Sequence, residues 1–312
     1  MSLKTFYHPG FAAPIGEQHV MPMRKFALVA DQLRRHFSGV EFIEPVPVSE
    51  ADVLRVHARA YVDAVRTGAP RELAESQKFP WSEHLYPSVL LTSGGVLAAA
   101  RAALYEGFAS SLCSGFHHAC VDHGEGFCTF NGLIVAADAL RVEGRAKHVA
   151  ILDMDLHYGN GTAQLAVGRS HVTALSLYGN DYWQNVAYRD VRVRRHGDGE
   201  NHRSAALPEA CDRATMLGIM ESELPWLMSR GKPDLLLYQA GADPYFEDPY
   251  SPLHLDHDDL LERDRCVFRF ARDNSIPVAW VLAGGYTKDT SKVVKVHTNT
   301  FVAAMDVFEG RR

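Results

Sequence analysis

Short runs of apolar residues alternate with longer helical patterns along nearly the whole chain. The runs are rich in Val, Ile and Leu and are bounded by turn residues, which is typical of strands buried in a parallel sheet. They span residues 41–48, 110–116, 148–154, 171–177, 233–240 and 276–283. Strands and helices in alternation predict an α/β fold, with a mostly parallel sheet between layers of helices.

The stretches between these runs are expected to be helices. They cover residues 24–37, 49–66, 94–107, 131–143, 208–229, 257–273 and 291–308. Ser49 and Asp52 fit a capping box at the start of the second helix. Glycine follows several helix ends, as at Gly68 and Gly107, where it is favoured. Because no repeat or long linker interrupts the pattern, we expect a single three-layer domain over residues 1–312.

Composition excludes several classes of protein. The 312 residues carry 32 Lys plus Arg and 38 Asp plus Glu, a net charge of −6, which argues against a nucleic-acid-binding surface. The arginines between Arg189 and Arg195 are expected to form a solvated edge. No uninterrupted run of about 18 apolar residues occurs, so we expect no membrane span. The first residues, MSLKTFYHPGF, have one Lys but no long apolar core behind it, so we expect no signal peptide. Five irregularly spaced cysteines indicate reduced thiols in a cytoplasmic protein.

Polar side chains follow four of the predicted strands, at the points where those strands end. In chain order they are His117 and His118, then Asp155 and His157, then Asp243, and finally Gly284-Gly285-Tyr286. Ligands of open α/β sheets bind beyond the carboxyl ends of the parallel strands. The sequence therefore predicts one site built from four separate strand ends.

A divalent cation suits the acidic part of this group. Asp153, Asp155 and His157 alternate along an extended segment, so their side chains point to the same side, although a polar strand end facing solvent gives the same pattern. Asp243 would complete three protein ligands and leave a fourth position for water, as in a catalytic zinc site. Such ligation also admits Fe²⁺, Co²⁺ or Mn²⁺, and Asp243 alone could cap the following turn.

The remaining polar residues have structural interpretations beside catalytic ones. Paired histidines also occur in surface loops, but the glycines around His117 and His118 let the backbone approach a ligand closely. Tyr286 could donate to a developing oxyanion, and an ordinary packed tyrosine is the alternative. His123 is assigned no role, and residues 159–162 are expected to be a tight turn that opens a helix rather than a phosphate site.

Four segments resemble the zinc-dependent histone deacetylase family, in order and at matching spacing. They are GFHHACVDHGEGFCTFNGLIVAA, ILDMDLHYGNGTAQ, LYQAGADPYFEDP and VLAGGY. Further segments resemble the class IV branch and its bacterial relatives, namely FYHPGF, HVMPMRKF, FPWSEHL and GGYTKDT with VHTNTFVAA. The resemblance covers nearly the whole chain. It implies the arginase–deacetylase fold and removal of an acetyl or longer acyl group from the side-chain amine of acyl-lysine.

The resemblance also implies roles for individual residues of the predicted site. One zinc ion per chain would be bound by Asp155, His157 and Asp243. His118 would be the general base and acid, oriented by Asn160. His117 would be its electrostatic partner, oriented by Asp153, and Tyr286 would donate to the oxyanion.

Substrate and a second ion are implied in the same way. The residues implied to line an acyl-lysine tunnel are Gly126, Phe127, Tyr182, Gly284 and Gly285. A structural potassium ion is implied at the side chains of Asp153 and Ser176, completed by backbone carbonyls.

Two features depart from the family pattern. Tyr158 stands where the family usually has His or Gln, and it is expected to point away from the metal and to change packing only. The acidic rim residue that grips a peptide in many deacetylases is not evident near residues 86–87, where Glu17, Glu83 or Asp181 would have to replace it. A peptide substrate is therefore less firmly implied than the chemistry.

Other functions remain open beside an acyl-lysine hydrolase. Arginase chemistry with two manganese ions would need aspartates where Gly159 and Tyr245 stand, so a single-metal site is favoured. The same hydrolysis could act on small acetylated amines such as polyamines. A metal-stabilised binding module without catalysis is the third alternative, and the intact catalytic positions argue against it. The oligomeric state is left open, a homo-oligomer included.

Overall fold

An eight-stranded sheet lies at the centre of the computed structural model, which describes residues 2–16, 19–183, 186–187 and 199–310. Its order is β2-β1-β3-β10-β9-β4-β5-β8, and every pairing is parallel. The strands are β1 (Leu3–Phe6), β2 (Val40–Ile43), β3 (Phe108–Ser114), β4 (Val149–Asp153), β5 (Val172–Tyr178), β8 (His202–Ala206), β9 (Leu235–Ala240) and β10 (Val278–Leu282). Strands β6 (Tyr182–Trp183) and β7 (Val186–Ala187) form a separate antiparallel pair.

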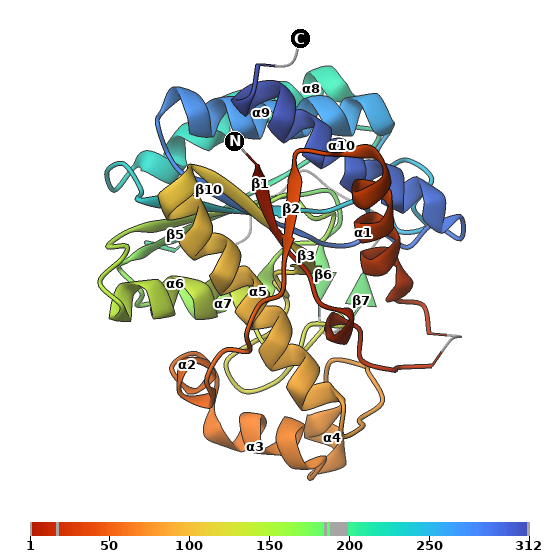
Figure 1. Ribbon diagram of the computed structural model, residues 1–312, viewed down its shortest axis with the longest axis vertical. Helices are drawn as coiled ribbons and strands as arrows, with labels where there is room; N and C mark the ends of the chain where they lie inside the picture. Colours follow the sequence, from red (N-terminus) through yellow and green to blue (C-terminus); the bar gives the residue numbers. More distant parts are fainter. Residues whose placement is uncertain (1, 17–18, 184–185, 188–198, 311–312) are drawn as a thin grey trace.

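Helices cover both faces of this sheet, which confirms the predicted three-layer α/β fold (Figure 1). α5 packs on β3 and β10 and beside α6, whereas α10 packs beside α1 and α9 on the opposite face. The α-helices are α1 (Arg24–His36), α2 (Glu50–Leu54), α3 (Arg59–Thr67), α4 (Arg71–Ala74), α5 (Leu85–Glu106), α6 (Gly132–Val142), α7 (Asn160–Ala166), α8 (Arg213–Glu223), α9 (His257–Asp273) and α10 (Thr290–Phe308). Two 3₁₀ helices span Pro9–Phe11 and Leu224–Met228.

The five central strands are buried on both faces, as the Val-, Ile- and Leu-rich sequences of β4, β5, β9 and β10 predict; β3, with the sequence FASSLCS, is equally buried. Trp280 of β10 shows how the layers interlock. Its ring meets Phe268 of α9 and Phe301 of α10 edge-on, with centroids 5.1 and 5.2 Å away. All three side chains are fully buried. A rigid core of this kind holds the carboxyl ends of the strands in fixed positions.

The predicted strand 41–48 is wrong in its second half, because β2 ends at Ile43. Pro45 and Pro47 have no amide hydrogen to give to a strand ladder. Val48 instead donates its backbone N–H to the carbonyl of Leu90, at 3.0 Å. The segment therefore leaves the sheet and runs along α5.

The predicted helix 49–66 is two helices, α2 and α3, separated by residues 55–58. The break lets His57 turn inward. Its Nδ1 lies 2.8 Å from the carbonyl oxygen of Cys120, and its Nε2 accepts from the N–H of Asn131 at 3.0 Å. These partners lie far along the chain, so the helical pattern gave no sign of the break. The predicted capping box at the start of α2 is confirmed.

Two further helices differ from their predicted bounds. The helix predicted from residue 94 begins at residue 85, so Gly94 lies inside it. A glycine is needed there because a Cβ would stand 1.9 Å from the carbonyl oxygen of Val46. The helix predicted over 208–229 begins after Asp212, which caps α8, and it tightens to 3₁₀ geometry from Leu224. Strands β1 and β8 were not predicted.

Helix α5 is the one described segment with the length and apolar composition of a membrane span. This helix was not singled out from the sequence, because polar residues such as Ser93 and Arg101 interrupt its apolar run. In this fold α5 lies against the sheet, and 61% of its most apolar window is buried inside the protein. Its apolar surface thus serves the packing of the core.

Candidate active site

The loops that leave β3, β4, β9 and β10 meet at one edge of the sheet, as predicted from their polar residues. Two hydrogen bonds join loops of different strands. The N–H of Gly284, after β10, donates to Oδ2 of Asp155 at 2.8 Å, and the N–H of Leu156, after β4, donates to Oδ1 of Asp243 at 3.0 Å. Each carboxylate is thereby fixed through one oxygen.

The other carboxylate oxygens converge on His157. Its Nδ1 lies 3.1 Å from Oδ1 of Asp155 and 3.2 Å from Oδ2 of Asp243. All three side chains are buried. A neutral imidazole has one hydrogen to share between its two nitrogens, so it cannot satisfy both carboxylates from Nδ1. The predicted trio is therefore brought together as three possible metal ligands.

The charges of this trio call for a cation. Burial opposes a positive charge on His157, but hydrogen bonds to Asp155 and Asp243 outweigh it and raise the pKa of His157 to about 10. Burial and the charge of Asp155 raise the pKa of Asp243 to about 6. One oxygen of each buried carboxylate faces the same imidazole nitrogen. A divalent ion fits a donor set of this kind.

His117 lies beside the trio and pairs with Asp153, the last residue of β4. Its Nδ1 is 2.6 Å from Oδ2 of Asp153, and its Nε2 is 3.7 Å from Oδ1 of Asp155. Burial lowers the pKa of His117, but the two carboxylates outweigh burial and raise it above its usual range. Asp153 therefore bonds to His117 and is not one of the three possible metal ligands. The alternation of side chains along the strand did not by itself predict this difference.

His118 pairs with a neutral partner instead. Its Nδ1 lies 2.6 Å from Oδ1 of Asn160, at the start of α7. The ring of Tyr182 stacks on the imidazole, with centroids 3.9 Å apart and planes 22° apart. Burial, together with the positive charges of His117 and His157, holds the pKa of His118 well below its usual range. His118 is thus kept neutral and ready to accept a proton.

Four rings surround His157. Those of His118, Tyr182, Tyr250 and Tyr286 all have centroids 5.8–6.2 Å from its own. Tyr286 is fixed at its backbone, where its N–H donates to Oδ2 of Asp248 at 2.7 Å. Burial raises the pKa of its phenol well above the usual value. The hydroxyl of Tyr286 therefore stays protonated and can donate a hydrogen bond.

The predicted tunnel residues Gly126 and Phe127 lie next to these rings. Both have positive φ, 49° and 66°. A Cβ at Gly126 would stand 2.4 Å from Cδ2 of His118. Phe127 stacks on Phe79 with centroids 5.7 Å apart and lies 6.3 Å from the ring of Tyr286. The chain thus passes close under the base and turns the Phe127 ring towards Tyr286.

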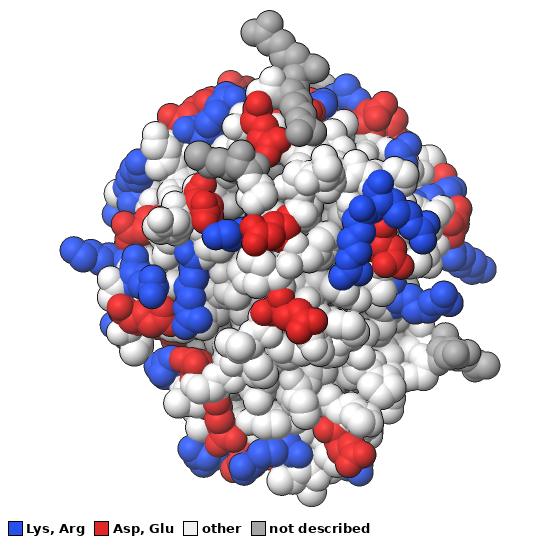
Figure 2. Space-filling view, in the orientation of Figure 1, with Lys and Arg blue, Asp and Glu red and all other residues white. Residues whose placement is uncertain are grey.

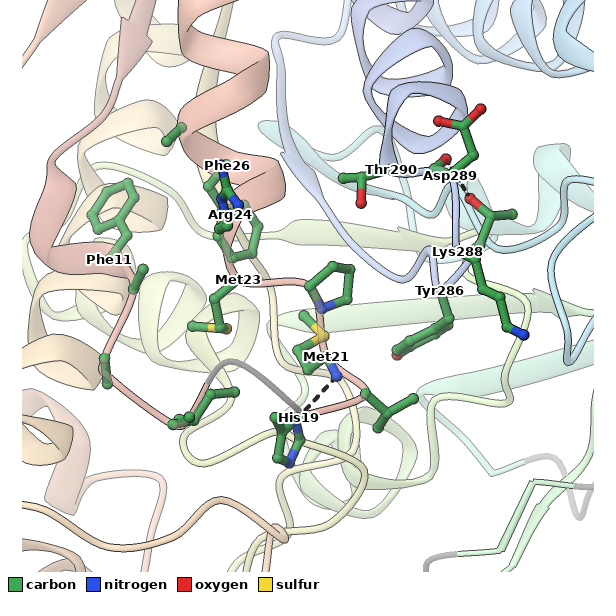
Figure 3. Close-up of a pocket in the computed structure, with 18 of the residues that line it drawn as sticks. Phe11, His19, Met21, Met23, Arg24, Phe26, Tyr286, Lys288, Asp289 and Thr290 are labelled. Carbon is green, nitrogen blue, oxygen red and sulfur yellow. Dashed lines mark hydrogen bonds between the residues drawn. The ribbon is translucent and has the colours of Figure 1, made fainter.

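A cavity of about 1430 Å³ opens on the outer side of Tyr286 (Figure 3). It lies between the N-terminal segment and the loop that precedes α10. Tyr286 and Lys288 enter it from that loop, opposite Met21 and Met23. Tyr250 also lines it, so two of the four rings beside His157, those of Tyr250 and Tyr286, line this cavity.

The residues implied to bind potassium are neighbours. Asp153 and Ser176 are paired across β4 and β5, and both lie close to Gly159, where a Cβ would stand 2.4 Å from Oδ2 of Asp153. Ser176 Oγ accepts from the N–H of Gly159 at 3.3 Å. The geometry brings the two side chains together beside the His117 pair.

The departures from the family pattern fall outside the trio. Tyr158 packs on Tyr178, with ring centroids 5.3 Å apart, in a small cluster that also contains Tyr182, whose ring stacks on that of His118. Of the suggested rim residues, Asp181 is buried and Glu83 is exposed, and neither lines the cavity. Glu17 and residues 189–195 lie outside the described residues.

Three contributors to the site were not predicted from the sequence. Lys25 is fully buried and donates from Nζ to the carbonyl of Ala283, just before Gly284. Burial lowers its pKa to about 8. The sequence did contain one sign of this burial, because Lys25 lies on the same face of α1 as the apolar residues Val29 and Leu33. Asp248 and Tyr250 gave no signal, because only the loop after β9 brings them back to Tyr286.

One face of the molecule carries both signs of charge. Figure 2 shows acidic and basic side chains interspersed over this face of the described residues, with no continuous basic area on it. The net charge of −6 is thus not accompanied by a strongly polarised surface on this side.

Comparison with known proteins agrees with this architecture. Residues 19–301 match the model of the histone deacetylase domain. An uncharacterized protein of Picosynechococcus is 32% identical over 99% of this chain and 100% of its own length. Histone deacetylase 2 of Arabidopsis thaliana is 29% identical over 81% of this chain and 65% of its own length. An acetylpolyamine amidohydrolase of Burkholderia pseudomallei is 32% identical over 80% of this chain and 69% of its own length.

Solved structures show the same fold. The crystal structure of acetylpolyamine aminohydrolase from Burkholderia pseudomallei superposes with a TM-score of 0.79, at 23% identity, over 98% of this chain and 99% of that one. The parallel sheet between helical layers is therefore the arginase–deacetylase fold. Within that fold, the chain belongs to the histone deacetylase family, and it is a deacetylase of that family.

Proposed function

We propose that this protein is a zinc-dependent amidohydrolase that removes an acyl group from the side-chain amine of acyl-lysine. One observation carries the proposal. The possible metal ligands, a neutral imidazole and a protonated phenol stand around one point, with the rings of His118 and Tyr286 6.0 and 6.2 Å from that of His157. A metal, a base and an oxyanion donor are the groups that amide hydrolysis needs.

In this proposal Asp155, His157 and Asp243 hold the zinc ion. A bound zinc ion polarises the amide carbonyl and acidifies water. Zinc fits because the donor set has one imidazole nitrogen and two carboxylates, three protein ligands in all. We also infer that Asp153 and Ser176 hold a potassium ion, whose positive charge would compensate the buried carboxylate beside His117.

The proton transfers fall to His118. Its Nδ1 is occupied by Asn160, so Nε2 accepts a proton from the attacking water and then delivers it to the leaving lysine amine. His117, held by Asp153, keeps a positive charge beside His118 and lowers its pKa. Tyr286 donates its hydroxyl hydrogen to the oxygen of the scissile amide as negative charge develops there.

The charges around the cavity favour acyl-lysine over an acetylated polyamine. Three of its lining residues are basic and two are acidic, a sum of +1, namely Arg24, Lys288, Lys292, Glu247 and Asp289. Glu247 pairs with Lys292, and Asp289 caps α10. A polyamine brings further ammonium groups, which need unpaired carboxylates at the mouth of the site. A neutral acyl-lysine amide does not.

Hydrolysis of acetylated small amines is the second candidate, because a relative that is 32% identical is named an acetylpolyamine amidohydrolase. The deciding experiment compares kcat/KM of the zinc-loaded protein on lysine peptides that carry acetyl, trifluoroacetyl or myristoyl groups with kcat/KM on N-acetylated polyamines. We expect the peptides to be the better substrates, and the preferred chain length to report the depth of the pocket.

Each alternative predicts a different result in that comparison. Faster turnover of acetylpolyamines would replace the acyl-lysine assignment with the second candidate. No turnover of any substrate by protein with one bound zinc would favour a non-catalytic binding module. Two metal ions per chain would revive arginase-type chemistry.

A further inference from the structure

A chain of hydrogen bonds runs from His118 towards the surface through residues outside the metal trio. Asn160 accepts at Oδ1 from Nδ1 of His118, at 2.6 Å, and donates from Nδ2 to Oε2 of Glu125, at 2.8 Å. The other oxygen of Glu125 lies 3.1 Å from Nε2 of His123. Nδ1 of His123 in turn lies 2.7 Å from Asp122.

An asparagine beside a catalytic histidine has an ambiguity that an aspartate lacks. Its amide has one end that only accepts hydrogen bonds and one end that only donates them. With its oxygen towards Nδ1 of His118, the ring carries its hydrogen on Nδ1 and Nε2 is a base. With its nitrogen towards Nδ1, the hydrogen would move to Nε2, and that nitrogen could no longer take a proton from water.

We propose that Glu125 is a positioning residue that fixes the amide orientation of Asn160 and thereby the tautomer of His118. A carboxylate only accepts hydrogen bonds, so the atom of Asn160 that faces it must be the NH₂ group. The amide oxygen is then left for His118. The inference rests on the proposed function in one respect, namely that His118 is the base.

Glu125 is itself held in one place. It is buried, and its backbone pairs with that of Cys128. The glycines on either side pack tightly, since a Cβ at Gly124 would stand 2.5 Å from the hydroxyl of Tyr61. His123 lies between Glu125 and Asp122, and hydrogen bonds to these two outweigh burial and raise its pKa. His123 therefore donates to Glu125 and takes up its second oxygen.

The proposal is tested by exchanging the hydrogen-bond donor, Asn160, and the acceptor, Glu125. In Glu125→Gln the side chain at 125 can present either end to Asn160, so both orientations become populated and kcat falls about 10- to 100-fold. Asn160→Asp alone places two carboxylates at hydrogen-bond distance and also lowers kcat. The double variant Glu125→Gln/Asn160→Asp lets the glutamine NH₂ donate to the new aspartate, which always accepts from His118.

The double variant should therefore be more active than either single variant, with KM and zinc content unchanged in all three. Glu209→Gln is the matched control for the loss of one carboxylate, and it should change kcat by less than about twofold because Glu209 is exposed. If the fold-decrease in kcat of the double variant equalled the product of the fold-decreases of the two single variants, the proposal would be overturned, because the effects of independent defects multiply.

A second measurement does not require turnover. In protein with ¹⁵N-labelled histidine, the His118 signals, assigned by their loss in His118→Gln, should report hydrogen on Nδ1 in the wild type. In Glu125→Gln they should report hydrogen partly on Nε2. An unchanged tautomer in Glu125→Gln would refute the positioning role. A changed tautomer in a protein that hydrolyses no substrate would refute the proposed function and leave the positioning role standing.

Discussion

Gly284 lies directly against the carboxylate of Asp243: a Cβ at position 284 would stand 1.8 Å from Oδ2 of Asp243. The same Cβ would stand 2.8 Å from Oδ2 of Asp155. Contacts of this kind cannot exist between a methyl group and a carboxylate, so any side chain at 284 would displace two of the proposed zinc ligands. The first glycine after β10 therefore belongs to the metal site.

We expect Gly284→Ala to weaken zinc binding at least tenfold, the scale reported for residues that hold metal ligands in place. Competition with a chelator of known affinity measures this directly. Gly218→Ala is the matched control, because Gly218 is exposed inside α8 and an added Cβ meets nothing within 4 Å. That variant should bind zinc normally and unfold with about 0.5–1 kcal/mol more free energy. Equal zinc affinities in the two variants would contradict the assignment of the ligands.

Tyr286→Phe tests the oxyanion donor. Removal of one such donor commonly costs about 10²–10³ in kcat, whereas the aromatic ring and its packing against Tyr250 are retained. Zinc content should stay at one ion per chain. Tyr245→Phe removes a hydroxyl that bonds to Glu247 and should leave kcat nearly unchanged. Full activity of Tyr286→Phe would show that another group meets the developing charge.

The proposed metal ligands stand out in the sequence because their spacing is local or tied to strand ends. Asp155 and His157 are two residues apart, and Asp243 lies three residues beyond Ala240, the last residue of β9. In contrast, Lys25 and Glu125 reach the site by tertiary folding. Nothing in the sequence around Glu125 tells which amide it faces, since Asn160 lies 35 positions away.

The elements missed or misplaced have a similar cause. The sequence of β8, HRSAA, has no strong strand former, and its residues are extended because β5 offers a free edge. The helix was predicted to begin at residue 94, yet Gly94 lies in the middle of α5, where the carbonyl oxygen of Val46 leaves no room for a Cβ. Local patterns therefore predicted the central strands well, whereas the sheet edges and helix bounds depended on contacts between distant segments.

His57 predicts how stability depends on pH. Burial lowers the pKa of this histidine to about 4 from an unperturbed 6.5, and protonation of Nε2 would break its bond from the N–H of Asn131. Between pH 6.5 and 4 the unfolded chain binds a proton that the folded chain does not. The free energy of unfolding should therefore decrease as the pH is lowered from 6.5 to 4. This group contributes a decrease of up to about 1.4 kcal/mol per pH unit.

Urea unfolding of the wild type and of His57→Gln between pH 4 and 7.5 measures this contribution. Glutamine can accept from Asn131 and donate to Cys120 without titrating, so the slope below pH 6.5 should be shallower in the variant. Above pH 6.5 neither state binds the proton, and the two curves should run parallel. Parallel curves at all pH values would show that His57 does not contribute.

Arg263 connects the stability of the fold to the loops of the site. This fully buried residue of α9 donates from Nη1 to the carbonyls of Gly241 and Met154, at 2.7 and 3.3 Å, just before the ligands Asp243 and Asp155. Its Nε donates to Oδ1 of Asp264 at 2.9 Å. The guanidinium thus holds together the two loops that carry the carboxylate ligands.

We expect Arg263→Met to lower the free energy of unfolding by about 3–5 kcal/mol, because it leaves the buried charge of Asp264 without its partner. Zinc affinity should fall as well, since the two loops lose their shared donor. In Arg263→Met/Asp264→Asn the buried charge is gone. The hydroxyls of Tyr238 and Thr300 bond to Oδ1 and Oδ2 of Asp264 at 2.5 and 2.6 Å, so in the variant one would donate to the amide oxygen and the other would accept from the amide NH₂. Stability should therefore recover in part while zinc affinity stays low. If both properties recovered together, the effect on zinc would come from general destabilisation rather than from the loops.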